Sequence, residues 1–322
     1  MGTIKRLVTA ALLVAGVGSA LGQQPYPHRL ITIIVPLSLG TGADILARVF
    51  GAKLAERWGV SVIVENKPGA GSILGTELAA RAAGDGYTLF MAPTSFALQP
   101  ALYKTARYDV FRSFAPVCLI ATGALAFAVS DNTPARTIKE FTALAKARPG
   151  DLNYASPGNG TPQHLAMELF KLDAGIDALH VPYKDTGSAL RELASGHVNA
   201  MIVPVWTIAP LAQAGRVRVL ANLGSERSTV FPNAPTLKEE GFPNVNVLVW
   251  IGLMAPASTP PEIVAKLNGE VNAILGLSDV KDLLGKQGLV SVGGKPEKLG
   301  DLVKSDFARW TRAIAAAKIK AD

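Results

Sequence analysis

A glycine-rich loop with the residue types to bind an anion lies near the start of the chain. It is "VPLSLGTGAD", residues 35–44, between an apolar run and the helical pattern "ILARVFGAKL". The first amides of a helix have no acceptor within the helix, and the helix dipole favours negative charge there by about 0.3 to 1 kcal/mol. Glycines in the loop leave the main chain open to a ligand. The loop therefore predicts an anion site, and the alternative is an ordinary turn in which the Asp44 carboxylate serves the helix start.

A second loop, "SPGNGTPQH" at residues 156–164, repeats this order of strand, glycine-rich turn and helix, with Thr161 at the helix start. We expect the two loops to face each other. About four or five charge-assisted hydrogen bonds, each contributing about 1.5 to 3 kcal/mol, would then leave a micromolar affinity, about 8 kcal/mol, after the cost of association. His164 stands on the first helical turn, where it either touches a ligand or positions the loop.

The sequence offers no motif for catalysis or cofactor binding. In "PGAGSILG" the glycines follow a GxGxxxG spacing with Pro68 in the turn, which is a poor match to the dinucleotide fingerprint. There is no GxxxxGK[ST] loop, GxSxG elbow, HExxH or metal-spaced Cys/His set. We therefore expect no enzyme activity, no metal and no organic cofactor. The histidines are scattered: His28, His164, His180 and His197.

The segments that position these loops alternate between β-branched apolar runs and helical patterns, which predicts an α/β fold with a mostly parallel sheet. The helix after the first loop carries Leu46, Phe50 and Leu54 on one face and ends at Gly59. Strands are expected at 30–36, 60–66, 87–93, 116–121, 125–130, 152–157, 178–183, 198–204, 217–224 and 247–256, and helices at 43–59, 73–83, 137–150, 161–175, 187–196, 208–215, 260–275 and 299–317.

A mature chain of about 300 residues usually exceeds one core, so we expect two α/β lobes. We place the first crossing between lobes near residues 121–127 and the return near 243–254. The extents are then residues 23–124 with 245–322 for lobe 1, and residues 125–244 for lobe 2. Two lobes joined by two crossings leave a cleft, which is a common place for a ligand.

The N-terminus indicates export. Lys5 and Arg6 precede the apolar stretch Leu7 to Leu21, which is shorter than the roughly 20 residues that a membrane-spanning helix needs. We predict a signal peptide over residues 1–22, cleaved at "ALG/QQ". The alternatives are cleavage earlier, at "GSA/L", and a retained membrane anchor.

Composition is typical of a chain with one or two sizeable cores, since 49% of residues are hydrophobic and 18% are charged. The single cysteine, Cys118, lies in the apolar run "APVCLIA", so no internal disulfide can form and we expect a buried, inert thiol. The formal charge is +7, or +5 without Lys5 and Arg6, and it is spread along the chain. Nucleic acid is therefore not an expected partner.

The sequence resembles the periplasmic solute-binding receptors of tripartite tricarboxylate transporters, the Bug-type receptors, over essentially the whole mature chain. The resemblance implies a two-lobed type II periplasmic binding protein fold that closes over a small carboxylate and delivers it to membrane permease subunits. We expect a periplasmic monomer. The segments that carry the resemblance are "YPHRLITIIVP", "LGTGAD", "VIVENKPGAGSILGTELAARAAGDGYTLFMA", "ALYKTARYDVFRSFAPV", "AKARPGDLNYASPGNGTPQHLAMELF", "HVPYK", "VLANLGSERSTVFPNAPTLKEEGFP" and "APASTPPEIVAKLN".

The resemblance also implies that loops 36–44 and 156–163 hold one carboxylate, largely through backbone amides and ordered water. The remainder of the ligand then meets less constant residues. The predicted ligand-binding residues are Ser38, Leu39, Gly40, Thr41, Gly42, Asp44, Ser95, Phe96, Gly158, Asn159, Gly160, Thr161, His164, Tyr183, Asp185, Val203 and Trp206.

Three departures from the family pattern bear on the ligand. Phe96 stands where a polar residue is common, and Val203 and Trp206 stand where polar or small residues are frequent. Together they indicate a pocket floor too apolar for citrate, and we expect an aromatic or aliphatic mono- or dicarboxylate. The alternative is that Phe96 and Trp206 pack in the core.

Other departures change the polar groups of the predicted site. Thr41 replaces the second of two usual glycines, Gln99 replaces an asparagine, and Asp185 places an acid near the mouth of the cleft. Two other functions stay open. One is a sensory protein that presents its ligand to a membrane kinase, and the other is a hydrolase on the same scaffold.

Overall fold

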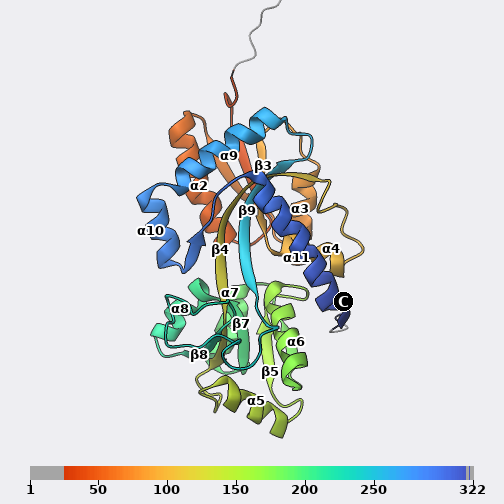
Figure 1. Ribbon diagram of the computed structural model, residues 1–322, viewed down its shortest axis with the longest axis vertical. Helices are drawn as coiled ribbons and strands as arrows, with labels where there is room; N and C mark the ends of the chain where they lie inside the picture. The colour runs from red at the N-terminus through yellow and green to blue at the C-terminus, as the bar shows by residue number, and fades with distance from the viewer. Residues whose placement is uncertain (1–24, 317–318, 320–322) are drawn as a thin grey trace, which may run out of the picture.

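The computed structural model describes residues 25–316 and residue 319. The predicted signal peptide, residues 1–22, lies outside the described residues. None of the described helices is both long enough and apolar enough to cross a membrane. The described chain forms an elongated α/β molecule with an upper and a lower half (Figure 1). One sheet runs through both halves in the strand order β2-β1-β3-β9-β4-β7-β5-β6, with β10 and β8 paired to β4.

The upper half of Figure 1, called lobe 1 below, is built on parallel strands at the start of the chain. Strand β1 is central, with Ile33 opposite Val64 of β2 and Leu89 of β3. The antiparallel strand β9 then joins β3 to β4. The elements are β1 (Ile31–Val35), β2 (Val62–Asn66), β3 (Thr88–Pro93), β9 (Leu248–Pro256), β10 (Leu289–Ser291), α2 (Gly42–Trp58), η1 (Ala70–Ser72), α3 (Ile73–Ala80), α4 (Ser95–Leu102), α9 (Pro261–Leu275), α10 (Ser278–Lys286) and α11 (Pro296–Ala316).

The lower half, called lobe 2, holds the other end of this sheet, which again combines parallel strands with antiparallel pairing to β4. Strands β7, β5 and β6 are parallel neighbours, and both β7 and β8 pair antiparallel with β4. The elements are β5 (Asn153–Ser156), β6 (Leu179–Pro182), β7 (Ala200–Pro204), β8 (Val217–Asn222), α5 (Ile138–Ala147), α6 (Pro162–Ala174), α7 (Thr186–Ser195) and α8 (Val205–Gln213).

Strand β4 (Phe114–Ser130) connects the lobes as one strand of 17 residues, where the sequence predicted two short strands. Its pairing with β9 ends at Ala124, and its pairing with β7 begins at Leu125. We propose the division of the lobes at this change of partner. On the return crossing, Val245 and Val247 are still buried in the lobe 2 core before β9 begins at Leu248. We therefore propose that the returning chain leaves lobe 2 after Val247, within the range 243–254 predicted for this crossing.

Helix α2 packs as its sequence predicts. Leu46, Phe50 and Leu54 have no exposed surface and belong to the main core of lobe 1. The helix ends at Gly59, whose φ is 67° and whose amide donates to the carbonyl of Ala55 at 2.9 Å. A glycine suits this end because the left-handed region is costly for residues that carry a Cβ. Packing and the C-terminal cap together fix where the N-terminus of α2 lies.

Helix α11 runs from lobe 1 towards lobe 2 along one side of the molecule (Figure 1). Its first half packs in lobe 1 through Leu299 and Val303, whereas Trp310 and Ile314 are buried with the lobe 2 core. Asp306 lies between these pairs and accepts a hydrogen bond of 2.6 Å from Nε1 of Trp250 on β9. One helix thus contacts both cores close to the return crossing.

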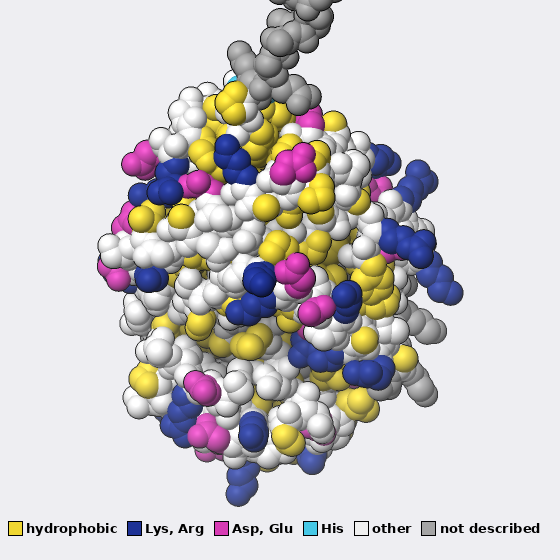
Figure 2. All heavy atoms as spheres, turned by 45° about the horizontal axis from the view of Figure 1, so that its top comes forward, with side chains coloured by type: hydrophobic (Ala, Val, Ile, Leu, Met, Phe, Trp, Pro, Cys, Tyr) yellow, Lys and Arg dark blue, Asp and Glu magenta, His cyan; other side chains and the backbone are white. Residues whose placement is uncertain are grey.

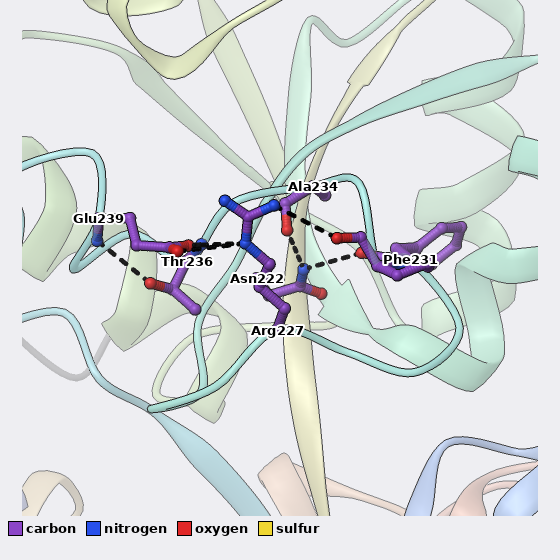
Figure 3. Close-up of polar contacts among 7 residues, drawn as sticks. Asn222, Arg227, Phe231, Ala234, Thr236 and Glu239 are labelled. Carbon is purple, nitrogen blue, oxygen red and sulfur yellow. Dashed lines mark hydrogen bonds and ion pairs between the residues drawn. The ribbon is translucent and has the colours of Figure 1, made fainter.

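The segment that follows β8 is held to lobe 2 by a polar network (Figure 3). Nδ2 of Asn222 donates to the carbonyl of Ala234 at 2.9 Å. Thr236 and Glu239 bond reciprocally: the Thr236 amide donates to the Glu239 carboxylate, and the Glu239 amide donates to the Thr236 hydroxyl. Arg227 pairs with the same carboxylate at 3.1 Å. This proline-rich segment is therefore part of the lobe 2 framework.

Candidate functional site

Both glycine-rich loops lie at the carboxyl ends of parallel strands, where ligands of α/β proteins usually bind. Residues 36–41 join β1 to α2, and residues 157–161 join β5 to α6. Because β3 is the parallel neighbour of β1, the start of α4 lies beside the first loop. In the same way β7 is the parallel neighbour of β5, so the start of α8 lies beside the second.

The first loop is closed by two side chains on α2 and its cap. The Thr41 hydroxyl donates to the carbonyl of Ser38 at 2.9 Å and accepts from the amide of Asp44 at 3.4 Å. The Asp44 carboxylate accepts from the amide of Gly40 at 2.9 Å. Thr41 is therefore the N-cap of α2, and Asp44 stabilises the loop from within.

The Asp44 carboxylate is buried, with 3% of the residue exposed, and it has further partners. Nδ2 of Asn66 donates to it at 3.0 Å, and Arg48 forms an ion pair with it at 2.9 Å. Burial alone would raise its pKa, but hydrogen bonds from Gly40, Arg48 and Asn66, with the charge of Arg48, hold the pKa below its ordinary value. Asp44 thus places a fixed negative charge beside the start of α2.

The second loop has the same hydrogen-bond scheme. The Thr161 hydroxyl donates to the carbonyl of Gly158 at 2.8 Å and accepts from the amide of His164 at 3.3 Å. The amide of Gly160 donates to Nδ1 of His164 at 3.0 Å. The two loops therefore share one architecture, with an imidazole in lobe 2 at the position of the carboxylate in lobe 1.

An aromatic stack supports His164. Its ring lies 4.0 Å from the ring of His180, which in turn lies 4.8 Å from the ring of Tyr154. Nε2 of His180 is 2.7 Å from the hydroxyl of Ser156. Burial first, then His164 and Lys171, lower the pKa of His180 to about 3, so its imidazole is neutral at neutral pH. The hydrogen bond to Gly160 and this stack support the interpretation that His164 positions the loop.

Each loop also contacts the opposite lobe. From lobe 1, Nε2 of Gln99 donates to the carbonyls of Gly71 at 2.9 Å and Gly160 at 3.3 Å. The Tyr103 hydroxyl, just after α4, donates to the carbonyl of Asn159 at 3.4 Å. A Cβ on Gly160, whose φ is 67°, would lie 2.2 Å from Leu102. Conformation and space therefore both require glycine there.

The reciprocal contact comes from Trp206 of lobe 2. A Cβ built on Gly42 at the start of α2 would lie 3.0 Å from Cζ2 of the Trp206 ring. The half-buried Trp206 also packs against the main core of lobe 1. The two loops thus lie at the boundary between the lobes.

Phe96 and Val203 are placed in the cores, against the prediction that they form a pocket floor. Neither has any exposed surface. The Phe96 ring stacks on Tyr108 at 5.6 Å and packs edge-on against Phe90 at 5.8 Å, while Val203 belongs to a lobe 2 cluster beneath α7 and α8. The alternative of core packing therefore applies to Phe96, and Val203 is corrected in the same way.

The other predicted residues have local roles or exposed positions. Ser95 is buried and its hydroxyl is 2.9 Å from the hydroxyl of Ser72. Asp185 caps α7, and the hydrogen bond from the Ser188 amide, at 2.8 Å, is the largest cause of its lowered pKa. Leu39 is 70% exposed at the tip of the first loop, and Tyr183 is half-buried after β6.

Gln99 is a site residue that the prediction omitted, although its departure from the family pattern was visible in the sequence. The side chain is fully buried, and its Oε1 has no hydrogen-bond partner among the described residues. Its partners come from segments distant in sequence, so no local pattern indicates them.

Two cavities lie away from the loops. One, of about 420 Å³, lies between α5 and residues 239–242 of lobe 2, and the other, of about 310 Å³, lies between α11 and residues 110–116 of lobe 1. Neither is lined by a predicted ligand-binding residue. In the described part of the chain, no group of three His, Cys, Asp or Glu residues could hold a metal ion.

Figure 2 shows Lys and Arg side chains interspersed with Asp and Glu over the face that it presents. That face carries no continuous basic surface. The arrangement does not resemble the basic stripe by which proteins bind nucleic acid.

Comparisons with known proteins show the family and the fold of this chain. Residues 46–319 match the tripartite tricarboxylate transporter family receptor. Protein BugT of Bordetella pertussis is 33% identical over 95% of both chains. The structure of R. palustris Rpa4515 with adipate is 32% identical, covering 92% of this chain and 99% of that one, with a TM-score of 0.87. The structure of MatC (Rpa3494) from Rhodopseudomonas palustris with bound malate is 31% identical, covering 90% of this chain and 100% of that one, with a TM-score of 0.84.

The fold class predicted from the sequence is therefore confirmed, because these neighbours and the periplasmic binding protein BugD, with a TM-score of 0.86, share it. The match to the family covers most of the chain and includes the second loop, whereas the first loop, residues 36–44, precedes the matched range. The chain belongs to the receptor family of the tripartite tricarboxylate transporters.

Proposed function

We propose that this protein is a periplasmic, monomeric receptor that captures one small carboxylate between its two glycine-rich loops and delivers it to the permease subunits of a transporter. The observation that carries the proposal is the pair of loops. They have the same hydrogen-bond scheme, start a helix in opposite lobes, and each contacts the other lobe. Such a pair can enclose one anion from two sides.

Helix geometry determines which backbone amides of the two loops are available to bind a carboxylate. The amides of Gly40 and Gly160 already bond to Asp44 and His164 within their loops. At the start of α2, Gly42 and Ala43 have no acceptor inside the helix. At the start of α6 the first residue is Pro162, which has no N–H, so Gln163 is the remaining donor there. The small number of free amides supports a carboxylate that is held by a few amides together with ordered water.

The ligand class is an aliphatic or aromatic mono- or dicarboxylate. Adipate and malate are present in the structures of two relatives. With Phe96 and Val203 in the cores, the argument for an apolar wall rests on Trp206 alone, which is half-buried between the lobes. An indole face favours a methylene chain or a flat ring over a polyhydroxylated acid.

Capture is proposed to follow rotation of the lobes about the two crossings. In the described state both loops are packed against the opposite lobe, so a ligand enters when the lobes separate. A ligand that bonds to both loops binds the closed state better than the open one, and this difference in affinity drives closure.

Thermal unfolding of the mature protein in the presence of adipate, malate, benzoate and citrate tests the proposal. A ligand at 100 times its Kd stabilises the folded state by about 2.7 kcal/mol, which raises the Tm by several degrees. The diamide of adipic acid is the matched control, since it keeps the chain and lacks the charge, and we expect it to leave Tm unchanged. If no carboxylate raises Tm, or if the pure protein hydrolyses carboxylate esters, the receptor function is wrong.

A further inference from the structure

Trp206 occupies the boundary between the lobes on the side of the first crossing. It is the second residue of α8, the helix that follows β7 directly. Its indole reaches across to Gly42 on α2 and to Gly123 on β4, one residue before the pairing of β4 with β9 ends. The ring therefore lies between the start of α2 and the strand about which the lobes are proposed to rotate.

Backbone conformation does not explain why residues 42 and 123 are glycines. Gly42 is in a helix and Gly123 in a strand, and neither has a φ in the left-handed region. Glycine weakens such elements by roughly 0.5 to 1 kcal/mol relative to alanine. A Cβ on Gly123 would lie 2.4 Å from Cζ3 of Trp206, and one on Gly42 would lie 3.0 Å from Cζ2. The indole is the nearest group at both positions, with Ile251 at 3.2 Å beside Gly42 and Leu289 at 2.8 Å beside Gly123.

The indole is not wholly part of the core. It packs against the lobe 1 core but keeps exposed surface, unlike the fully buried Phe96 and Val203. Because β7 is the parallel neighbour of β5, the start of α8 that carries Trp206 lies beside the second loop, while the ring touches the start of α2. A carboxylate held by both loops therefore has the indole as its neighbour on the side of the crossing.

We propose that Trp206 determines ligand selectivity by filling the space between Gly42 and Gly123. The inference rests on the proposed function and specifies its substrate class. The ring accepts a slender chain or a flat ring along its face and leaves no room for a branched tricarboxylate. Replacing it with a small side chain opens this space, so branched acids gain room. Slender acids lose the apolar contact with the ring.

Isothermal titration of adipate and citrate into the wild-type protein, Trp206→Ala and Trp206→Phe tests this inference. We expect the ratio of the citrate Kd to the adipate Kd to fall at least about tenfold in Trp206→Ala, the discrimination that the fit of one or two methylene groups provides. Trp206→Phe, which keeps an aromatic face, should lower the ratio less. The Tm of each variant shows whether it is folded.

Tyr103→Phe is the matched control, because it removes another contact between the lobes without enlarging the space beside Gly42. A change in closure alone alters both Kd values by the same factor, so this control should leave the ratio unchanged. If the wild-type protein binds carboxylates and Trp206→Ala keeps the wild-type ratio, the selectivity role is overturned and the receptor function stands. A wild-type protein that binds neither these acids nor the other carboxylates tested above overturns both.

Discussion

The two loops of the site have one hydrogen-bond scheme but differ in the residue that closes it. In lobe 1 the amide of Gly40 donates to the carboxylate of Asp44, and in lobe 2 the amide of Gly160 donates to the imidazole of His164. The first loop is therefore closed by a charged group. The second is closed by a ring that stacks on His180.

The same loop geometry thus carries a carboxylate in one lobe and an imidazole in the other, which would present different electrostatics to the proposed ligand. The first loop precedes two amides without an intrahelical acceptor, yet the negative charge of Asp44 lies beside them, balanced in part by Arg48. The second loop precedes a proline and offers fewer amides, but it carries no negative charge of its own. The first loop therefore combines more amide donors with a negative charge, whereas the second combines fewer donors with none, so the two differences offset each other.

The largest effect on stability is expected from Asp44→Ala. The change leaves the amide of Gly40 without its acceptor and removes the ion-pair partner of Arg48. The Asn66 side chain loses one of its two acceptors and keeps the carbonyl of Leu37. Since hydrogen bonds to charged groups contribute most, we expect a loss of about 2 to 4 kcal/mol in the free energy of unfolding, measured with urea. Asp44→Asn keeps an acceptor and should lose less. Equal stability of Asp44→Ala and wild type would show that the carboxylate does not hold this loop.

His164→Ala should have a smaller effect, about 1 to 3 kcal/mol, because the lost acceptor is neutral while the Gly160 amide is left buried. Carboxylate affinity should fall as well, since the loop is no longer fixed. His164→Asn, whose amide oxygen can accept from Gly160, is the control and should recover part of both losses. If His164→Ala loses affinity with no loss of stability, His164 contacts the ligand and does not merely position the loop.

Removal of the two cap hydroxyls tests whether the loops are equivalent. Thr41→Val and Thr161→Val each delete an N-cap oxygen and its bond to a loop carbonyl. Each should cost about 1 kcal/mol in urea unfolding, the usual size of a cap. Losses that differ by more than about 1 kcal/mol would mean that the shared scheme does not carry equal weight in the two lobes.

Acid should destabilise the protein through His180, the ring that stacks on His164. The folded-state pKa of His180 is about 3, whereas the unfolded chain titrates near 6.5, so between these pH values the unfolded state binds more protons and stability falls as pH falls. The pKa of Asp44 is also lowered, so its contribution is fully present above the ordinary value of 3.8 and is lost as the pH falls through the lower pKa of the folded state. Lobe 2 should thus respond first, and His180→Phe should flatten the urea-unfolding profile between pH 6.5 and 4. An unchanged profile would contradict this assignment.

Local patterns predicted the elements that depend on neighbouring residues. The face of Leu46, Phe50 and Leu54, the end of α2 at Gly59, and both turns into helices follow from spacing, caps and glycines. Helix α4 was not predicted, because it is short and contains Pro100. The two strands expected at 116–121 and 125–130 form one strand, since β4 continues through Gly123 while it changes partner.

The sequence by itself determined the α/β class, the family and the two loops, because turn chemistry and hydrophobic periodicity act over a few residues. Only the tertiary structure decided which apolar side chains enter the cores and which reach the boundary between the lobes. Phe96 and Trp206 are both large aromatic residues near helix starts, yet the first is enclosed by Tyr108, Phe90 and Phe114 and the second reaches the opposite lobe. Burial depends on what distant segments bring against a side chain, and hydrogen bonds such as Gln99 to Gly160 exist only after the lobes have met.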